Sequence, residues 1–350
     1  MRHIVKKNIS GNEYYYFQLK LASIDPKKEP YLYSKYIGEY LPSESVLKNF
    51  LMKRAEDLAI ITASNLGKGI RTYFRNGPDI KEVERDRWWF YFINNYDLFE
   101  DQNSTYQSLF AILFTLHTNV IEGSKMRQDD IIAMTSDSRK KVVTFEEKEV
   151  TNTLDALKFS VSNEMKWNVS SIKKLHSKIL PDDPLAGKFR IREVEVGDAT
   201  RTRLYNTVEP QKIRKELREL LYWFNREHNK VYPPQLALEF HWRFERIHPF
   251  QDGNGRVGRL LLNRILIEHH FMPVIFFSEN VRQYYDAIAQ ARNGNSSKLA
   301  TFFLRQNKKT KEAMERFKRE GIVSGRRSRI GRWTIKRGKT PKEYDVEAEE

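Results

Sequence analysis

The chain of 350 residues contains no cysteine, which excludes disulfides and thiol-ligated zinc or iron–sulfur sites. It has no run of 18 apolar residues, and Met1-Arg2-His3 does not open a signal peptide. Eight histidines are present without HExxH-like spacing, and no Gly-, Ser- or Pro-rich linker interrupts the sequence. We therefore expect a soluble, cytoplasmic protein with one main domain, no membrane contact and no structural metal.

Positive charge is abundant but unevenly placed. The formal net charge is +15, and residues 305–339 hold 14 Lys or Arg against 3 Asp or Glu. We interpret residues 306–350 as a basic C-terminal helix and tail attached to the main domain. Such a segment is either a solvated surface or a contact for nucleic acid or an acidic partner.

The first hundred residues differ from the rest and form a predicted α/β extension. Aromatic and apolar residues predict strands over 14–21 and 30–41, and Ser43 is suited to cap a helix over about 45–64. Aromatic residues beside lysines suit nucleic-acid binding, but a half-buried sheet more commonly accounts for them.

The most informative segment is His-Pro-Phe-Gln-Asp-Gly-Asn-Gly-Arg-Val-Gly-Arg at residues 248–259. Apolar residues at helical spacing follow it, so this turn leads into a helix whose first N–H groups are available to bind an anion. We expect Gly253 and Gly255 to allow close approach of phosphate and unusual backbone angles. The apolar residues that carry the spacing are Leu260, Leu261, Leu262, Ile265 and Leu266.

The polar side chains of this segment fit phosphate chemistry. Arg256 and Arg259 lie three residues apart, on one helical face, where they can neutralise phosphates. Asp252 offers the carboxylate that Mg²⁺ prefers. His248 is the candidate general base, because histidine is the side chain that most often takes this role. The segment predicts a nucleotide-phosphate site with His248 as its catalytic residue.

Residues 248–259 resemble the signature of the Fic family, HPFx(D/E)GNGRxxR, at every fixed position. The resemblance covers about residues 104–305. It includes a predicted amphipathic helix before His248, the segment Gly187-Lys188-Phe189-Arg190, and Arg282, Tyr284 and Tyr285, which resemble the segment that closes over the nucleotide base.

Membership of this family implies a mainly α-helical core with a small β-hairpin flap. It also implies transfer of AMP from ATP, with Mg²⁺, to a Tyr, Thr or Ser hydroxyl of a target protein or of the chain itself. The implied roles are general base for His248, Mg²⁺ ligand for Asp252, α-phosphate binding for Asn254 with the amides of Gly253 and Gly255, β-phosphate binding for Arg256, γ-phosphate binding for Arg259, and base binding for Tyr284 and Tyr285.

A second motif suggests regulation. Thr118, Glu122 and Gly123 match the family's inhibitory pattern, (S/T)xxxE(G/N), within a predicted helix over about 104–123. In relatives this glutamate pairs with the second signature arginine, here Arg259, and blocks the γ-phosphate. Some relatives with this arrangement run the reverse reaction, in which the glutamate orients a water that removes AMP.

The predicted flap, residues 187–208, is expected to hold the backbone of the target along its edge. Its arginines would make it basic, so this face is either a solvated hairpin surface or a contact for an acidic target. The chain departs from the family after this flap, where Pro210 stands alone in place of the usual cluster of prolines. It departs again at Arg292-Asn293, near the base pocket. The basic flap residues are Arg190, Arg192, Arg201 and Arg203.

Three functions follow from these motifs. The favoured one is an autoinhibited protein adenylyltransferase, with residues 101–305 as its Fic domain. The second is a hydrolase that removes AMP with the help of Glu122. The third is a nucleotide-binding regulatory protein whose basic tail binds nucleic acid, although a binding protein has no need of His248 beside a phosphate site.

Overall fold

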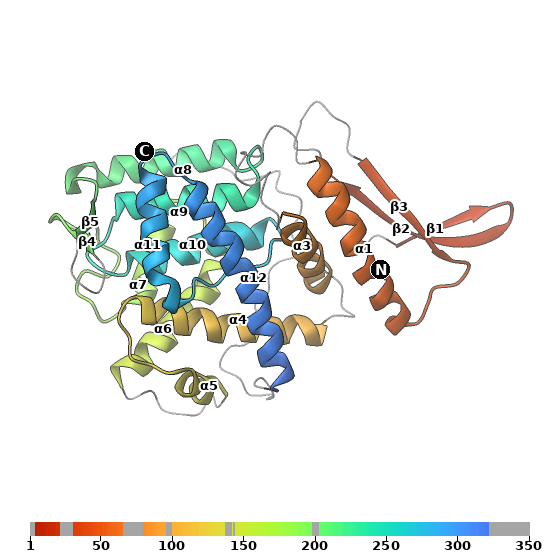
Figure 1. The fold of residues 1–350 in the computed structure, drawn as a ribbon, viewed down its shortest axis with the longest axis horizontal. Coiled ribbons are helices and arrows are strands. Elements are labelled where there is room, and N and C mark those ends of the chain that lie inside the picture. Colours follow the sequence, from red (N-terminus) through yellow and green to blue (C-terminus); the bar gives the residue numbers. More distant parts are fainter. Residues whose placement is uncertain are drawn as a thin grey trace. The chain divides into compact units, whose positions relative to one another are not determined.

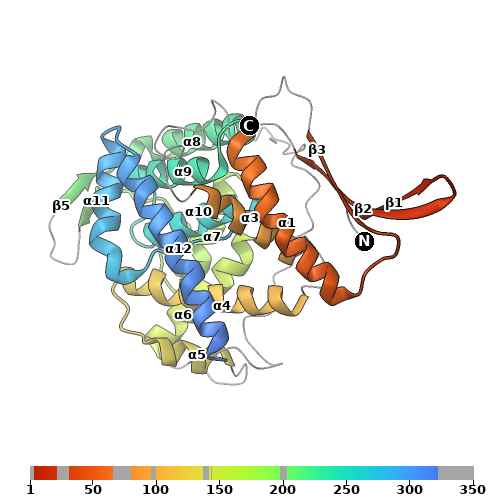
Figure 2. The same cartoon turned by 45° about the vertical axis from the view of Figure 1, so that its right-hand side comes forward.

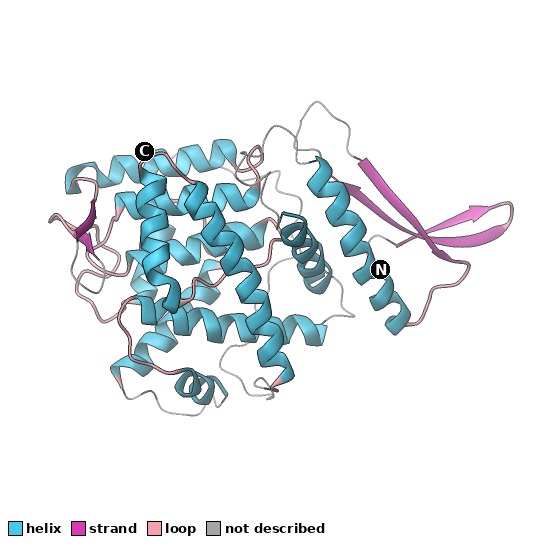
Figure 3. Cartoon of the chain, in the orientation of Figure 1, coloured by secondary structure: helices cyan, strands magenta, loops and turns pink. Residues whose placement is uncertain are grey.

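The chain is mainly α-helical, as the sequence predicts, with two small antiparallel sheets (Figures 1 and 3). The computed structural model describes residues 4–21, 31–65, 80–95, 100–136, 142, 144–197 and 203–321. They fall into two compact units. Unit 1 comprises residues 1–103 and 229–232, and unit 2 comprises 104–228 and 233–350.

Unit 1 contains a sheet of three antiparallel strands: β1 (Ile4–Ile9), β2 (Asn12–Leu21) and β3 (Tyr31–Gly38), in the order β1-β2-β3. The sequence predicts only the last two. β1 escapes prediction because nearly all of its side chains are exposed, so it lacks an apolar alternation. The sequence feature that could have predicted the β1–β2 hairpin is the Ser10-Gly11 turn. Both residues have positive φ, as two-residue hairpin turns prefer.

One face of this sheet packs on helices. α1 (Glu44–Asn65) and α3 (Ile80–Asn95) cover it, and the ring of Phe17 lies between Phe50 of α1 and Phe92 of α3. The predicted helix over 45–64 is therefore confirmed as α1.

Unit 1 also includes a short piece of chain that comes late in the sequence. Tyr232 is fully buried, and its hydroxyl donates a hydrogen bond of 2.9 Å to the buried carboxylate of Glu84 in α3. Arg87 lies 3.2 Å from the same carboxylate. A buried carboxylate requires such partners, because burial without them costs several kcal/mol.

Unit 2 holds the remaining helices and a two-stranded sheet, β4 (Glu195–Gly197) and β5 (Arg203–Asn206). Its helices are α4 (Glu100–Ile121), which begins in unit 1, α5 (Gln128–Ser136), α6 (Phe145–Ser160), α7 (Val169–Ile179), α8 (Ile213–Glu227), α9 (Pro233–Ile247), α10 (Asn254–Glu268), α11 (Val281–Arg292) and α12 (Ser297–Arg319). Short 3₁₀ turns, η2 (Pro210–Lys212) and η3 (Ser278–Asn280), precede α8 and α11.

α10 is the central helix of unit 2. It packs against α9, α7 and α6 (Figure 2). Nearly every side chain along it is buried. The apolar residues that predicted this helix, from Leu260 to Leu266, lie in the core. Because α10 is fixed on several sides, its N-terminus is a rigid place for a binding site.

The basic C-terminal region begins differently from the sequence interpretation. Helix α12 runs unbroken across residue 305, and Thr310, Ala313, Met314 and Phe317 are buried. Residues 306–317 therefore contribute to the core of unit 2, because their apolar side chains recur at helical spacing among the lysines. The rest of the predicted tail, from residue 322, lies outside the described residues.

No helix within the described ranges is long and apolar enough to cross a membrane.

Two buried histidines predict a loss of stability in mild acid. Burial lowers the pKa of His117 and His241 to about 4, from an ordinary value of 6.5. The unfolded chain therefore binds more protons than the folded chain between these values, so the free energy of unfolding falls as pH drops from 6.5 toward 4. Each group contributes on the order of 1–2 kcal/mol over this window.

The variant His117→Gln tests this. Nδ1 of His117 accepts a hydrogen bond of 3.2 Å from the Ser278 amide, and a glutamine oxygen can replace it without titrating. Chemical denaturation at pH 7 and pH 5 should show a smaller loss for the variant than for the parent protein. Equal losses in the two proteins would contradict the assignment.

Candidate active site

The site begins where α9 ends, at a strained residue. His248 has a φ of 49°, in the left-handed region that side chains other than glycine seldom adopt. Arg190 stabilises this turn: its Nε donates to the carbonyl of His248 at 2.7 Å, and its own N–H donates to the carbonyl of Pro249 at 3.0 Å. Strain of this kind persists only where neighbouring groups hold it, and here the backbone carbonyls are held.

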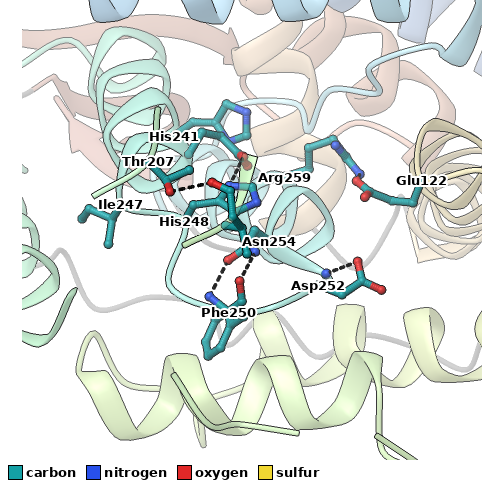
Figure 4. Close-up of polar contacts among 12 residues, drawn as sticks. Glu122, Thr207, His241, Ile247, His248, Phe250, Asp252, Asn254 and Arg259 are labelled. Carbon is teal, nitrogen blue, oxygen red and sulfur yellow. Dashed lines mark hydrogen bonds and ion pairs between the residues drawn. The ribbon is translucent and has the colours of Figure 1, made fainter. Parts of the chain in front are cut away.

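The next part of the loop is closed by a side chain of the signature. Oδ1 of Asn254 accepts the N–H of Phe250 at 2.9 Å, and its Nδ2 donates to the carbonyl of Phe250 at 2.8 Å (Figure 4). The structure thus places the Asn254 side chain in the loop itself. Its predicted contact with an α-phosphate would have to use its backbone N–H.

His176 of α7 supports the same loop through contacts with Phe250 and Asp252. Its ring stacks on Phe250 with centroids 3.9 Å apart. Its Nδ1 accepts the N–H of Gly187 at 2.9 Å, which leaves Nε2 to donate to the carbonyl of Asp252 at 3.0 Å. Burial lowers the pKa of His176, so the ring stays neutral and keeps this tautomer.

The two glycines that begin α10 serve different purposes. Gly253 has a φ of 76° and precedes the helix, so it needs the left-handed freedom that the sequence predicts. Gly255 does not, because it is helical; the expectation of unusual angles there is wrong. A Cβ at Gly255 would instead collide with Oε1 of Glu122. Close approach is the reason for that glycine.

The second signature arginine is buried against the predicted inhibitory motif. Nη2 of Arg259 lies 2.7 Å from Oε1 of Glu122 (Figure 4). Its Nε donates to Oγ1 of Thr118 at 2.8 Å. Gly123, with a φ of 99°, ends this stretch of chain directly after α4. Burial alone would lower the pKa of Arg259, but the Glu122 carboxylate raises it above its usual range.

The first signature arginine has a carboxylate partner that the sequence did not indicate. Nη1 of Arg256 lies 3.1 Å from Oε1 of Glu149 on α6, and its Nη2 lies 3.6 Å from Oδ2 of Asp252. Glu149 is one of several acidic residues near the start of α6, and nothing in the sequence separates it from the others. Both arginines are therefore oriented by acidic side chains.

Asp252 is the one predicted metal ligand, and its side chain is 61% exposed. No group of three or more His, Asp or Glu side chains suited to a metal occurs in the described part of the chain. This arrangement suits Mg²⁺ that arrives with a nucleotide, because Mg²⁺ is often held by one or two carboxylates with phosphates and waters.

The predicted base-binding tyrosines lie differently from each other. Tyr284 is buried, and its hydroxyl hydrogen-bonds Nε2 of His241 at 2.8 Å. Its ring lies 6.0 Å from the guanidinium of Arg259. Tyr285 is half-buried and packs beside it. The position of Tyr284 favours a structural role, in which its ring supports the guanidinium of Arg259. The ring of Tyr285 is the more accessible of the two.

The flap is a short hairpin made by β4 and β5, paired from Glu195 to Asn206. The sequence places Arg190 among the basic residues of the flap, but Arg190 is not exposed. It is buried, and its guanidinium donates to the carbonyls of Arg192 and Val208 and to Oγ1 of Thr207. Arg201, the turn residues Asp198 and Ala199, and the Arg203 side chain lie outside the described residues.

A further acidic residue was missed by the sequence reasoning. Glu245, one turn before His248 on α9, is buried with Oε2 3.6 Å from Nδ1 of His248. The available signal was a charged residue within the apolar stripe that delivers His248, which is an unusual place for a carboxylate.

Known proteins resemble this chain in sequence. A sequence model of the Fic/DOC family matches residues 166–266. The protein adenylyltransferase fic-1 of Caenorhabditis briggsae is 34% identical over 131 residues, which are 37% of this chain and 25% of that protein. The protein adenylyltransferase Fic of Nematostella vectensis is 29% identical over 206 residues, 56% of this chain and 47% of that protein. The chain thus spans a quarter to about half of the length of these relatives.

Solved structures share the fold. A Fic family protein from Desulfovibrio desulfuricans G20 superposes with a TM-score of 0.56 at 19% identity, over 71% of this chain and 77% of that one. Fic-1 from Caenorhabditis elegans gives a TM-score of 0.50 at 21% identity, over 79% of this chain and 87% of that one. The solved structures thus show a shared fold, and the Fic/DOC match places the sequence similarity over residues 166–266, which include the signature at the start of α10.

Proposed function

We propose that this protein is an autoinhibited adenylyltransferase that moves AMP from ATP to a hydroxyl side chain of a protein. The observation that carries the proposal is the arrangement of the loop between α9 and α10. His248 lies at the start of this loop, and the amides that begin α10 lie at its end. Relatives named protein adenylyltransferase support the same activity.

The reaction needs little from the protein except position and charge. The target hydroxyl attacks the α-phosphorus, a new O–P bond forms, and the bond to pyrophosphate breaks. His248 takes the hydroxyl proton. The free N–H groups at the start of α10 face the α-phosphate, and Arg256 and Arg259 neutralise the phosphates that leave. Mg²⁺ beside Asp252 supplies further neutralising charge when bound.

Inhibition follows from competition for one guanidinium. Glu122 and Thr118 occupy the N–H donors of Arg259 that a γ-phosphate would use. ATP binds in a productive pose only when this pair opens, so the pair shifts the population toward an inactive state.

Glu122→Gly tests the inhibition. Removing the carboxylate frees Arg259 to bind the γ-phosphate. With Mg²⁺ and ATP that carries a label in its AMP part, the variant should label itself or added proteins at a rate roughly tenfold or more above the parent. The double variant Glu122→Gly with His248→Ala should lose roughly 10²–10⁴-fold of that rate.

The control is Glu279→Gly, because Glu279 is an exposed acidic residue that pairs with Lys309 instead of a signature arginine. Equal labelling by the Glu122→Gly variant and the parent would exclude the inhibitory role.

A second candidate function is removal of AMP from a modified protein. The observation that favours it is the position of Glu122, whose side chain is 21% exposed and reaches the start of α10 near Gly255. A carboxylate there can orient water against a phosphodiester.

The two directions separate in one experiment. A protein first labelled by the Glu122→Gly variant is incubated with the parent or with Glu122→Gln, without ATP. Release of AMP by the parent alone indicates the hydrolase. No release by either protein leaves transfer as the activity.

The clamp formed by Arg190 gives another prediction. Lysine keeps the charge but cannot bond the His248 carbonyl and both sides of the flap at once. In the Glu122→Gly background, Arg190→Lys should lower kcat for labelling roughly tenfold or more through misplaced His248, with nucleotide affinity nearly unchanged.

Arg214→Lys is the matched control, because Arg214 is exposed on α8. Titration of a fluorescent nucleotide reports binding separately from labelling. A loss of binding equal to the loss of rate would show that Arg190 does not act through His248.

A further inference from the structure

A buried polar cluster lies behind the catalytic loop and has no part in the mechanism so far. It is formed by His241 and Glu245 of α9, with Gly258 of α10 against them. Both polar side chains are almost completely buried, with exposures of 0% and 4%. A carboxylate in such a place needs a function or a strong partner to offset the cost of burial.

Glu245 faces the catalytic histidine. Oε2 of Glu245 lies 3.6 Å from Nδ1 of His248. Among the described residues, neither Nδ1 of His248 nor Oε1 of Glu245 has a hydrogen-bond partner. The two groups are three residues apart at the end of one helix, so a small side-chain rotation brings them to hydrogen-bond distance.

Other groups around Glu245 do not satisfy it. His241 uses Nε2 for the hydroxyl of Tyr284 at 2.8 Å. Arg259 directs its N–H groups to Thr118 and Glu122. Nδ1 of His241 also has no hydrogen-bond partner among the described residues, and it lies beside the same Gly258. The imidazole of His248 is the ring that lies within ion-pair distance of the carboxylate, at 3.6 Å.

Gly258 makes room for this carboxylate. A Cβ at that position would lie 2.5 Å from Oε1 of Glu245 and 3.1 Å from Nδ1 of His241. Gly258 is helical and lies in the second turn of α10, where glycine is less stabilising than alanine. The glycine at this position is thus explained by the side chain that packs on it.

We propose that Glu245 is a positioning residue that accepts the Nδ1–H of His248, so that Nε2 is unprotonated and directed at the target hydroxyl. The proposal rests on the proposed function. When Nε2 takes the proton, the carboxylate stays ionised and stabilises the imidazolium, and the proton later leaves to solvent or with the product.

The charge state of Glu245 agrees with this role. Burial would raise its pKa, but the imidazoles of His248 and His241 and the guanidinium of Arg259 hold the pKa below its usual range. Arg190, which also contacts His248, is bound to its backbone carbonyl and leaves the imidazole ring to Glu245.

The kinetic test uses the full chain in the Glu122→Gly background. Glu245→Gln should lower kcat for labelling roughly 10-fold to 10³-fold, with the KM for ATP changed less than about twofold. Glu239→Gln is the matched control: Glu239 is a second buried carboxylate on α9, bonded to Gln235 and Arg243. Equal rates for the two variants, or a change confined to KM, would overturn the proposal.

A second measurement does not depend on activity. Nitrogen-15 NMR of the histidine side chains should show neutral His248 in the Nδ1–H tautomer in the parent, and in the Nε2–H tautomer in Glu245→Leu. An Nε2–H tautomer in the parent would overturn the proposal. If no protein is ever labelled, the proposed function fails, while this spectrum still decides whether Glu245 orients the imidazole.

Discussion

The site depends on holding a short, strained turn between two helices. His248 adopts a left-handed backbone at the end of α9, and Gly253 adopts another just before α10. Two such residues within six positions would be mobile without support. Arg190 holds the first, the Asn254 side chain closes the middle, and His176 holds the carbonyl of Asp252. These are hydrogen bonds to backbone, so they fix the path of the loop whatever side chains it presents.

The second organising feature is the way buried positive charge is balanced. Arg259 pairs with Glu122 and Arg256 with Glu149, and each guanidinium is nearly inaccessible to solvent. A phosphate that binds here must replace one negative partner by another. The exchange costs little in charge balance, since a buried arginine is never left alone, and this makes the Glu122 pair suitable as a reversible block.

Much of the fold and part of the site can be predicted from the sequence, for physical reasons. The helices α4 and α10 follow from apolar periodicity, α1 follows from Ser43 as a cap, and the helical class follows from the resemblance carried by residues 248–259. The strand β1 cannot, because its side chains are exposed and its pairing with β2 is a backbone property. The predicted boundary near residue 305 falls inside α12, where buried residues recur at helical spacing among the lysines and arginines.

The site residues show the same division. Composition and spacing single out His248, Asp252, Arg256 and Arg259, since few kinds of site other than a phosphate site use these residue types in this order. Glu149 and the burial of Arg190 do not follow from local sequence, because each depends on a contact with a segment that lies elsewhere in the chain. Glu245 has only a weak local signal, a charged residue within an apolar stripe. Long-range pairing of charges is the information that periodicity does not contain.

The buried hydrogen bond between Tyr232 and Glu84 has a consequence for dissecting this molecule. Residues 229–232 belong to the same compact unit as the first hundred residues, although they connect α8 to α9. The chain therefore passes between the units three times, and no single cut separates them. A shortened chain that starts at residue 104 would remove Glu84, the acceptor of the Tyr232 hydroxyl, immediately before the helix that leads to His248. Lost activity in such a fragment would report damage to α9 as readily as the loss of a separate N-terminal role.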